Sequence, residues 1–542
     1  MSFWTVLIFA GLSAASLLAI RSTVHWFQLE SYQFPGFFRT MGRNTIKAVL
    51  PGIILNIIWL GGAWLLDAIF HGKQSVLSSL IMVLLLLSCG FLLRQVLREK
   101  KEKKPLAYTA RIKRLYTVAF FFFMLVLMLS AGFGIRTEPG AQHADRNILF
   151  LICMFFPLFL PLWFSLAGLL AWPIEKLISE MYFRDAQHIL KKRPDLILIG
   201  ITGSWGKTSV KYILGTLLQE HYNTLITPAS YNTPMGVTKI IRTKLEAGHK
   251  VFIAEMGARH VGDIREMCRL VHPSIGILTS VGPQHLDTFR TIERVTKTKY
   301  ELIDAIPENG VCFFADDGGI VRSLYEKTKK EKYISGTDAV FDGIWAENIR
   351  STPDGSKFDV CTKDRRICCE TEMLGELNIR NIVLCVSVCI RLGLTDKEIE
   401  RGVSKLKAVE HRLQLIRNSN GITVIDDAFN SNILGAEQAF RVIGGFPSNR
   451  FIVTPGMVEL GDREEEMNRH FGEMMADACD TAILIGKKRS RAIREGLMSK
   501  SFPEASVFVV NSLDEAAQLL GRNACPGDTI LFENDLPDNY SE

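Results

Sequence analysis

The stretch Gly200-Ile-Thr-Gly-Ser-Trp-Gly-Lys-Thr-Ser209 decides the fold of this chain. Four aliphatic residues at 196–199 precede it, which predicts a buried parallel strand, and apolar residues at helical spacing follow it from Val210 to Leu218. A glycine-rich loop between a strand and a helix binds phosphate, because its backbone N–H groups and the positive end of the helix dipole point at the anion. The stretch therefore predicts a nucleotide-binding loop.

Two side chains of this loop have the chemistry to act on a nucleotide. Lys207 would reach the outer phosphates, and the Thr208 hydroxyl would ligate Mg²⁺. The spacing differs from the common Walker A pattern, which places a glycine where this chain has Ile201. We expect a nucleotide loop of a distinct type rather than a glycine turn with an exposed lysine.

The region after residue 195 predicts a doubly wound α/β architecture. Short β-branched runs alternate there with helical patterns, which is typical of such sheets. The runs lie at 251–254, 275–278, 422–425, 451–453, 482–485, 507–510 and 529–532. They predict two successive units, of which the first contains the phosphate loop.

Acidic and imidazole side chains stand at the ends of these runs, where ligands bind in open α/β sheets. Glu255 ends the run that begins at Val251, His285 follows the next run, and Asp426-Asp427 end the run that begins at Ile422. The alternatives are a helix-capping acid for Glu255, a loop residue for His285 and a helix start for Asp426-Asp427. Their shared position downstream of a phosphate loop favours a common site.

The amino-terminal third predicts a membrane region. Five apolar segments reach the roughly 20 residues that a helix needs to cross a bilayer, at 3–20, 46–70, 76–97, 117–134 and 148–172. The first segment has neither a charged start nor a small-residue cleavage site, so we expect an anchor and not a signal peptide. Residues 173–193 predict an amphipathic helix, either on the inner membrane surface or packed on the next domain.

Charge is unevenly distributed along the chain. Residues 1–172 contain 16 Lys and Arg against 6 Asp and Glu, so the remaining residues contribute −4 to the net charge of +6. The connections at 21–45 and 98–114 hold eleven cations, against three at 71–75 and 135–147. By the positive-inside rule, the N-terminus lies outside a multiply crossed inner or plasma membrane, and the region after residue 172 is cytoplasmic. No basic stripe accompanies the phosphate loop, so a nucleic-acid partner is not expected.

The eleven cysteines are scattered and lack the paired spacing of a zinc site. Cys368-Cys369 and Cys385 with Cys389 lie in apolar stretches, and we expect all four to be buried thiols. This usage indicates a reducing compartment.

Several segments, in the same order, resemble the Mur ligases, which are ATP-dependent amide-forming enzymes of bacterial cell-wall synthesis. The loop at Thr202 to Thr208 matches their Thr-Gly-x-x-Gly-Lys-Thr, and Glu255-Met-Gly-Ala258 is similar to their Glu-Leu-Gly-Ala. Further similar segments are His285-Leu-Asp287, Thr298-Lys-Tyr-Glu301, Lys407-Ala-Val409 with Arg412-Leu413, and Asp426-Asp-Ala-Phe-Asn-Ser-Asn432. The resemblance covers about residues 195–520, and within the family it is strongest to members that add D-alanyl-D-alanine to a UDP-linked muramoyl tripeptide.

With the apolar segments, the resemblance implies a multi-domain fold. We expect a five-helix transmembrane region at 1–175, an α/β P-loop ATPase domain at 176–408 and a Rossmann-like α/β domain at 409–542. The resemblance also implies ATP and two Mg²⁺ ions as cofactors, and a Lys299 that is carbamylated by CO₂.

The site residues that the resemblance implies are those at matching positions. The catalytic ones are Lys207, Glu255, His285 and Lys299. Those that bind ATP are Thr202, Gly203, Gly206, Lys207, Thr208, Ser209, Asn378, Asn381, Arg412, Asp427 and Asn430. Those that bind substrate are Thr227, Asn232 and Thr233, and those that bind metal are Thr208, Glu255, His285 and Lys299.

The chain departs from the family in two places. Apolar segments replace the soluble amino-terminal domain that holds the UDP group, and Glu533-Asn-Asp-Leu-Pro-Asp538 replaces a closing Lys-Gly-Ser-Arg. These differences leave open whether the carboxylate donor is a UDP-linked or a lipid-linked peptide precursor, and whether the amine is an amino acid or a dipeptide.

The expected function is a membrane-anchored, ATP-dependent amide ligase that works through an acyl phosphate in cell-wall or cell-surface polymer synthesis. A poly-amino-acid capsule synthetase is the alternative among enzymes. A membrane transporter with an attached P-loop ATPase is the alternative of another class. Against the transporter, Met256-Gly257 follow Glu255 where such ATPases have a paired acid.

Overall fold

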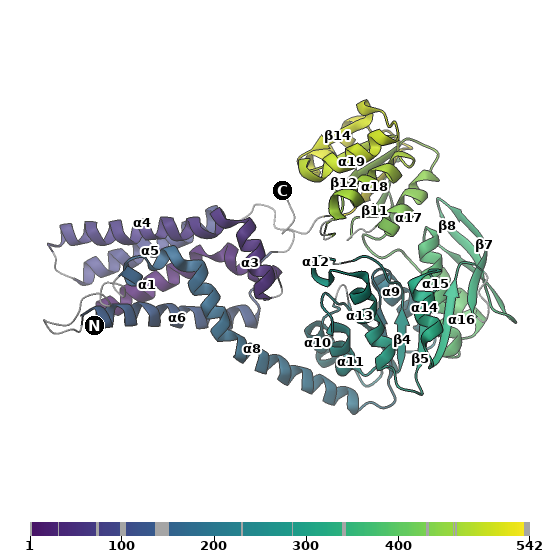
Figure 1. Cartoon of the computed structure of the whole chain (residues 1–542), viewed down its shortest axis with the longest axis horizontal. Coiled ribbons are helices and arrows are strands. Elements are labelled where there is room, and N and C mark those ends of the chain that lie inside the picture. The colour runs from purple at the N-terminus through teal and green to yellow at the C-terminus, as the bar shows by residue number, and fades with distance from the viewer. Residues whose placement is uncertain are drawn as a thin grey trace. The chain divides into compact units, whose positions relative to one another are not determined.

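The computed structural model describes residues 3–30, 32–71, 75–97, 105–135, 151–228, 231–284, 286–338, 343–429, 433–458, 460 and 463–535. The chain divides into two compact units, the first reaching to Ser179 and the second beginning at Glu180 (Figure 1). The first unit is helical, and the second is built on two sheets.

The first unit is a bundle of apolar helices. Its elements are α1 (Phe3–Ala19), α2 (Arg21–Leu29), α3 (Phe34–Arg43), α4 (Thr45–Ile69), α5 (Val76–Val96), α6 (Ala110–Ile135), the 3₁₀ turn η1 (Phe156–Phe159) and α8 (Leu160–Lys191). Within the described residues, four helices are long and apolar enough to cross a membrane, and the pair α1–α2, bent by 52°, makes a fifth if it is one span. Large side chains such as Trp64 and Phe121 are 75% and 65% exposed. Apolar exposure of this extent is typical of a surface that another apolar phase covers.

Small residues let α1 and α5 pack closely. Gly90 lies against the backbone of α1, where a Cβ would be 2.6 Å from the carbonyl oxygen of Ala15. Gly11 lies against Val83, where a Cβ would be 3.0 Å from the valine side chain. Close backbone approach through small residues is a common mode of helix association in membranes. Larger side chains at these positions would therefore separate the two helices.

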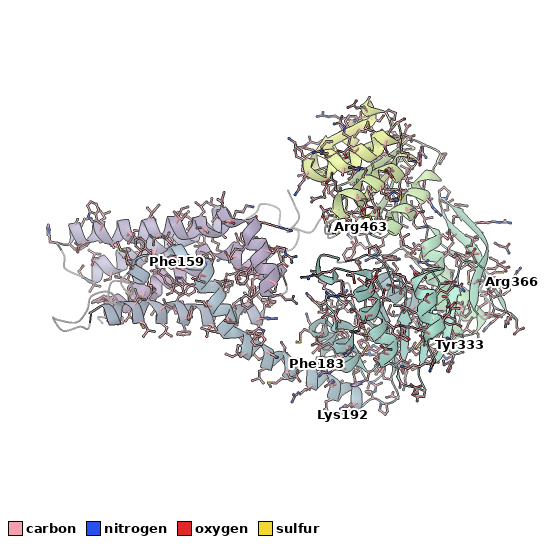
Figure 2. The ribbon with its side chains drawn as sticks, viewed as in Figure 1. Phe159, Phe183, Lys192, Tyr333, Arg366 and Arg463 are labelled. Carbon is pink, nitrogen blue, oxygen red and sulfur yellow. The ribbon has the colours of Figure 1, made fainter. Side chains whose placement is uncertain are left out.

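The helix α8 continues from the first unit into the second. It runs without a break through Pro173, where the sequence pattern predicted a change from a span to an amphipathic helix. Beyond the boundary, Phe183, Ala186 and Leu190 are buried in the core of the second unit (Figure 2). This burial agrees with the second of the two alternatives above, a helix packed on the next domain.

The second unit begins with a nine-stranded sheet in the order β2-β3-β1-β4-β5-β6-β7-β8-β9. Its strands are β1 (Ile197–Thr202), β2 (Thr224–Ile226), β3 (Val251–Glu255), β4 (Ile275–Leu278), β5 (Val311–Ala315), β6 (Glu331–Gly336), β7 (Ile344–Thr352), β8 (Gly355–Cys361) and β9 (Arg366–Thr371). Neighbours from β2 to β7 are parallel, and β7, β8 and β9 are antiparallel. Its helices are α9 (Lys207–Leu218), α10 (Pro234–Lys244), α11 (Asp263–Val271), α12 (Leu286–Phe289), α13 (Ile292–Ala305), α14 (Ile320–Lys327), α15 (Glu376–Arg391) and α16 (Asp396–Ser404).

The position of β1 in this sheet determines where a ligand can bind. β1 pairs with β3 on one side and with β4 on the other. The strands that follow β1 in the chain therefore lie on both sides of it, β2 and β3 on one side and β4 and β5 on the other. Open α/β sheets bind ligands at such a point, beyond the carboxyl ends of the strands. Ile199 and Ile201 of β1 pack with Val210 and Leu214 of α9 in one buried core. This packing fixes the place at which the strand ends and the phosphate loop begins.

The second sheet has six strands in the order β10-β11-β15-β12-β13-β14. They are β10 (Gln414–Arg417), β11 (Thr423–Asp427), β12 (Arg450–Thr454), β13 (Thr481–Ile485), β14 (Val507–Val510) and β15 (Thr529–Glu533). All pairs are parallel except β10–β11. The accompanying elements are α17 (Ile433–Gly444), α18 (Glu464–Ala476), α19 (Lys487–Ser499), η3 (Glu504–Ser506) and α20 (Leu513–Asn523).

The expected α/β fold is confirmed, and Asp426 and Asp427 are the last residues of β11, as expected. One local correction concerns a cysteine. Cys368 is exposed, whereas Cys369, Cys385 and Cys389 are buried as expected. The difference between Cys368 and its neighbour follows from the strand β9, because successive side chains of a strand point to opposite faces.

Candidate nucleotide site

The loop between β1 and α9 has a conformation that needs glycine. Gly206, which precedes the helix, has a φ of +80°, in the left-handed region that glycine adopts without strain. Gly203 lies so close to Thr279 that a Cβ would be 2.0 Å from the threonine hydroxyl. The two glycines let the backbone turn tightly into the helix N-terminus, which is the geometry of an anion-binding loop.

The segment after β4 holds this loop in place. The hydroxyls of Thr279 and Ser280 donate to the carbonyl oxygen of Trp205 at 2.5 and 2.9 Å, and the Trp205 N–H donates to Ser280 Oγ at 2.9 Å. Ser204 Oγ donates to the carbonyl oxygen of Gly282 at 3.0 Å. The indole of Trp205 covers Gly282, where a Cβ would lie 1.8 Å from the ring. These contacts order the loop before any nucleotide binds.

Lys207 turns back onto its own loop. Its Nζ donates to the carbonyl oxygens of Gly203 at 2.7 Å and Ser204 at 2.9 Å. Burial lowers the pKa of Lys207 to about 8, although the Glu255 carboxylate acts in the opposite direction. A poorly solvated ammonium group at the phosphate loop is well placed to bind an incoming phosphate.

Glu255 ends β3 and is almost fully buried. Its carboxylate accepts from Lys211 Nζ at 2.9 Å, from Thr208 Oγ1 at 3.1 Å and from Asn232 Nδ2 at 3.1 Å. Burial by itself would raise the pKa of Glu255, but Lys211 and Lys207 outweigh it, so the pKa lies below its ordinary value. Glu255 is therefore an ionised oxygen ligand in contact with the Thr208 hydroxyl.

These two oxygen groups suit a nucleotide-bound Mg²⁺. Among the described residues, no group of three or more His, Cys, Asp or Glu side chains could hold a metal by itself. Mg²⁺ in nucleotide sites takes one or two protein oxygens and completes its coordination with phosphates and water. Thr208 and Glu255 fit this requirement.

Lys299 in α13 is a buried amine. In the described part of the chain it has neither a hydrogen-bond nor an ion-pair partner. Burial, followed by the charge of Lys207, lowers the pKa of Lys299 well below its ordinary value. Its surroundings therefore favour the neutral form of the amine, which lies near the charges of the phosphate loop. His285, expected beside it, lies outside the described residues.

The segment that enters the second sheet brings Arg412 to the same site. Its guanidinium is close enough to lower the pKa of Lys207 and to interact with the Glu255 charge. It also lies over the Phe429 ring, 4.8 Å from the ring centre. An arginine held in this way can contact a nucleotide phosphate.

Two carboxylates at the end of β11 hold this segment. The Leu413 N–H donates to Asp427 Oδ1 at 3.0 Å, and His411 Nδ1 lies 2.7 Å from Asp426 Oδ2. His411 and Leu413 have φ values of +61° and +46°, which are strained for residues with a Cβ. Burial raises the pKa of Asp427 above its ordinary value. Asn430, the remaining residue expected here, lies outside the described residues.

The two expected adenine contacts lie one turn apart in α15. Asn381 adjoins the phosphate loop, because a Cβ on Gly206 would lie 3.2 Å from its amide oxygen. Asn378 donates to the carbonyl oxygen of Leu374 at 2.8 Å and is buried. One asparagine thus borders the loop, and the other is engaged with the backbone that precedes its helix.

The expected substrate residues flank Glu255 or begin α10. Thr227 Oγ1 accepts from the Glu255 N–H at 3.3 Å, and Asn232 contacts the carboxylate as described above. Thr233 caps α10 by accepting from the Gly236 N–H at 3.3 Å. Thr227 and Asn232 therefore adjoin the carboxylate, whereas the Thr233 hydroxyl serves the helix.

The two remaining loop residues are buried. Thr202 Oγ1 donates to the carbonyl oxygen of Met256 at 3.0 Å, which ties β1 to the end of β3. Ser209 lies in the first turn of α9.

Sequence reasoning did not assign Lys211, Thr279 and Ser280 to the site. Lys211 follows Lys207 by four residues, and this spacing places both on one face of a helix. Thr279 and Ser280 come directly after β4, where polar residues line the ligand crevice of such a sheet. Both signals were available in the sequence.

Two family models match the second unit. Residues 201–389 match the Mur ligase middle domain, and residues 411–533 match the Mur ligase, glutamate ligase domain. The UDP-N-acetylmuramoyl-tripeptide–D-alanyl-D-alanine ligase of Bacillus subtilis is 26% identical over 339 residues, which is 62% of this chain and 72% of that protein. The ligase of the same name from Escherichia coli is 28% identical over 316 residues, covering 58% and 70% of the two chains.

Solved structures show the same fold. MurF from Acinetobacter baumannii superimposes with a TM-score of 0.60 at 22% identity, over 67% of this chain and 78% of that one. MurF ligase from Thermotoga maritima in complex with ADP gives a TM-score of 0.60 at 23% identity, over 66% and 80%.

Proposed function

The chain belongs to the Mur ligase family, and we propose that it joins a muramoyl-peptide carboxylate to an amine through an acyl phosphate. The carboxylate would take the γ-phosphoryl group of ATP, and the amine nitrogen would then attack the acyl carbon and displace phosphate. The products are an amide, ADP and phosphate. The observation that supports this chemistry best is the cluster of Lys207, Thr208 and Glu255 at the N-terminus of α9.

The protein's part in this reaction is placement and charge. Lys207 would leave the carbonyl oxygens of its loop for the outer phosphates, where its charge stabilises the transferring phosphoryl group. Arg412 would add a second positive charge from the segment that enters the second sheet. Fixed charges of this kind act more strongly where water is excluded. Placement of the carboxylate beside the γ-phosphate supplies the rest of the rate enhancement.

ATP and two Mg²⁺ ions are the proposed cofactors. Thr208 and Glu255 would hold the first ion, and bound Mg²⁺ neutralises phosphate charge. Lys299 and His285 would hold the second, after Lys299 has been carbamylated. In that reaction the neutral amine forms an N–C bond with CO₂ and loses a proton, which gives a carboxylate-like ligand. The burial, low pKa and missing partner of Lys299 support this modification.

We propose a donor that is held at the membrane. The relatives from Bacillus subtilis and Escherichia coli are named as ligases of a UDP-linked tripeptide and D-alanyl-D-alanine. In this chain, apolar helices stand where the family places its UDP-binding domain. A lipid-linked peptide precursor therefore fits the chain better than a UDP-linked one, with an amino acid or dipeptide as the amine.

We also propose a location at the inner or plasma membrane. The N-terminus would lie outside, and the two α/β domains would lie in the cytoplasm, where ATP is available. The excess of cations in the connections at 21–45 and 98–114 supports this orientation.

An assay of the full-length protein in lipid nanodiscs tests the function. ATP turnover is measured against lipid-linked and UDP-linked muramoyl peptides combined with amino acids and dipeptides, and the product is weighed by mass spectrometry. We expect ADP release that needs both substrates, and a product equal to their sum less one water. Lys207→Ala should lower the rate by about 100-fold or more. The control is Lys397→Ala, which removes an exposed lysine of α16 and should leave the rate unchanged. Turnover without amide formation would refute the proposal.

A further inference from the structure

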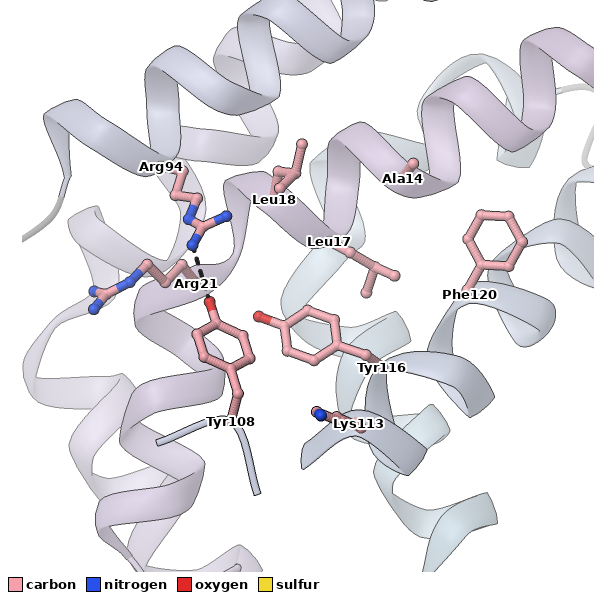
Figure 3. A pocket seen from close by; sticks show the side chains of 9 residues that line it. All are labelled: Ala14, Leu17, Leu18, Arg21, Arg94, Tyr108, Lys113, Tyr116 and Phe120. Carbon is pink, nitrogen blue, oxygen red and sulfur yellow. Dashed lines mark hydrogen bonds between the residues drawn. The ribbon is translucent and has the colours of Figure 1, made fainter. Parts of the chain in front are cut away.

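The helical unit contains a pocket of 460 Å³ that the ligase chemistry does not use (Figure 3). It lies where the C-terminal ends of α1 and α5 meet the N-terminal part of α6, and Tyr108 of the preceding segment borders it. Its volume falls in the range of roughly 300–1,000 Å³ that is usual for ligand sites. The pocket is therefore large enough for a specific occupant.

One end of the pocket is positively charged. Arg21, Arg94 and Lys113 line it, and none of the described lining residues is acidic. Arg94 donates to the Tyr108 hydroxyl at 3.3 Å, as Figure 3 shows. The ammonium group of Lys113 has no hydrogen-bond or ion-pair partner in the described part of the chain. The guanidinium of Arg94 and the ammonium group of Lys113 together offer charged donors that match a phosphate group.

The other end of the pocket is apolar. Ala14 and Leu17 line it from α1, and Phe120 lines it from α6. Phe120 follows Lys113 by seven residues of α6, so it lies about 10 Å along that helix from the cation. Both helices belong to candidate membrane spans. The pocket therefore changes from cationic to apolar along the direction that leads from the membrane surface to its interior.

We propose that this pocket binds an anionic phospholipid. The phosphate would contact Arg94 and Lys113, and the first part of an acyl chain would lie between Leu17 and Phe120. Free phosphate would leave the apolar end without a function, and a lipid without net negative charge would not match Arg94 and Lys113 at the other end. A lipid in this position would contact α1, α5 and α6 together. The proposal is independent of the ligase reaction, because it requires neither ATP nor an amine.

A photoreactive phosphatidylglycerol tests this assignment. The probe has its reactive group near the start of the acyl chain and is added to phosphatidylcholine nanodiscs that contain the full-length protein. We expect crosslinks to peptides of α1 or α6. The double variant Arg94→Gln/Lys113→Gln should lower the yield about tenfold or more. The matched control is Lys176→Gln, which removes an exposed cation of α8 outside the pocket and should have no effect.

A second variant examines the apolar end separately. Ala14→Phe fills that end and keeps all three cations, so it should also lower the crosslink yield. Equal labelling of the wild-type protein and both variants would overturn the proposal, as would equal labelling by a phosphatidylcholine probe. Competition by inorganic phosphate, with Ala14→Phe labelled normally, would show a free-phosphate site instead and also overturn it. Size-exclusion profiles identify a misfolded variant. If one variant is misfolded, the crosslink yield of the other variant tests the proposal.

Amide formation from the lipid-linked and the UDP-linked muramoyl peptides is measured on the same samples. Loss of lipid labelling with normal turnover supports the lipid site alone. Normal labelling without turnover argues against the ligase function and leaves the lipid site intact. The two proposals can therefore fail separately.

Discussion

Lys211 Nζ lies 2.9 Å from Glu255 Oε2, and the two side chains are 0% and 2% exposed. The pair joins the first turns of α9 to the last residue of β3. Glu255 also accepts from Thr208 and Asn232. Together with the ion pair to Lys211, these hydrogen bonds fix the carboxylate that we propose as a Mg²⁺ ligand. A buried ion pair is stable only while both charges are present, since a single buried ion is costly.

Removal of the lysine from this pair should destabilise the second unit. Lys211→Met leaves the Glu255 carboxylate buried without its cation, at a cost of about 3 kcal/mol. Thermal unfolding followed by tryptophan fluorescence in nanodiscs should show a lower Tm for the variant. Lys211→Met/Glu255→Leu should unfold at a higher temperature than Lys211→Met. The control is Lys405→Met, because Lys405 pairs with Glu220 at 2.6 Å while 55% exposed, and such surface pairs contribute little.

Nucleotide binding should take up a proton above pH 8. The pKa of Lys207 is about 8 in place of 10.5, so the amine is increasingly neutral as the pH rises through 8. Phosphate raises that pKa again, because it favours the charged form. The affinity for ADP should therefore fall between pH 8 and 10.5, and titration calorimetry in buffers of different ionisation enthalpy should detect the proton.

The same pKa has the opposite consequence for folding without nucleotide. The buried ammonium opposes folding at all pH values below about 8, and this cost declines between pH 8 and the unfolded pKa of 10.5.

The ADP-binding experiment has a matched control. Lys207→Met should abolish the proton uptake on ADP binding. Proton release by the wild-type protein at pH 9 would contradict the assignment.

Lys299→Ala should inactivate the ligase and recover partly with formate. The substitution removes the nitrogen that we propose is carbamylated, and a small carboxylate could occupy the space that the carbamate would take. Amide formation is measured with increasing formate in the full-length protein. Lys297→Ala removes an exposed lysine of the same helix and should be active without formate. Full activity of Lys299→Ala without formate would exclude the carbamate.

The parallel strands around the phosphate loop could be predicted because their sequences are nearly unbroken apolar runs. Residues 251–254 and 275–278 are buried on both faces of the sheet, and a continuous apolar run is typical of a strand in that position. The antiparallel strands β7 to β9 were not predicted. β7 mixes buried and exposed residues irregularly and contains a shift in register between Glu347 and Arg350, so no simple period marks it.

The site was predictable only as far as single segments allow. Glu255 could be placed at a strand end, but its contact with Lys211 depends on the way in which α9 packs against β3. The strained φ of Leu413 likewise accompanies a hydrogen bond to Asp427, which lies at the end of β11 and is not evident from the local sequence around Leu413. The pocket in the helical unit is lined by residues of four helices and of the segment before α6, so no single segment predicts it.

Gly90→Leu should disrupt the helical unit. A Cβ at position 90 would lie 2.6 Å from the carbonyl oxygen of Ala15, and a backbone atom cannot move aside as a side chain can. Gly61→Leu in α4 is the matched control, because nothing lies within 4 Å of its Cβ position. After heating in detergent, the fraction that stays monodisperse in size-exclusion chromatography should fall for Gly90→Leu and not for Gly61→Leu. Equal losses would show that the α1–α5 contact does not limit stability.

The orientation in the membrane can be tested with cysteines. Cys368 and Cys525 are exposed in the second unit, and they should react with a membrane-impermeant maleimide only after the cells are opened. Thr137→Cys, in the connection at 135–147, should be labelled in intact cells, and Lys103→Cys should not. The reason is the positive-inside rule. The connection at 98–114 has eight cations and should stay on the cytoplasmic side, whereas the connection at 135–147 has two and can lie outside. Labelling of Lys103→Cys in intact cells would reverse the orientation and would place the nucleotide loop on the side without ATP.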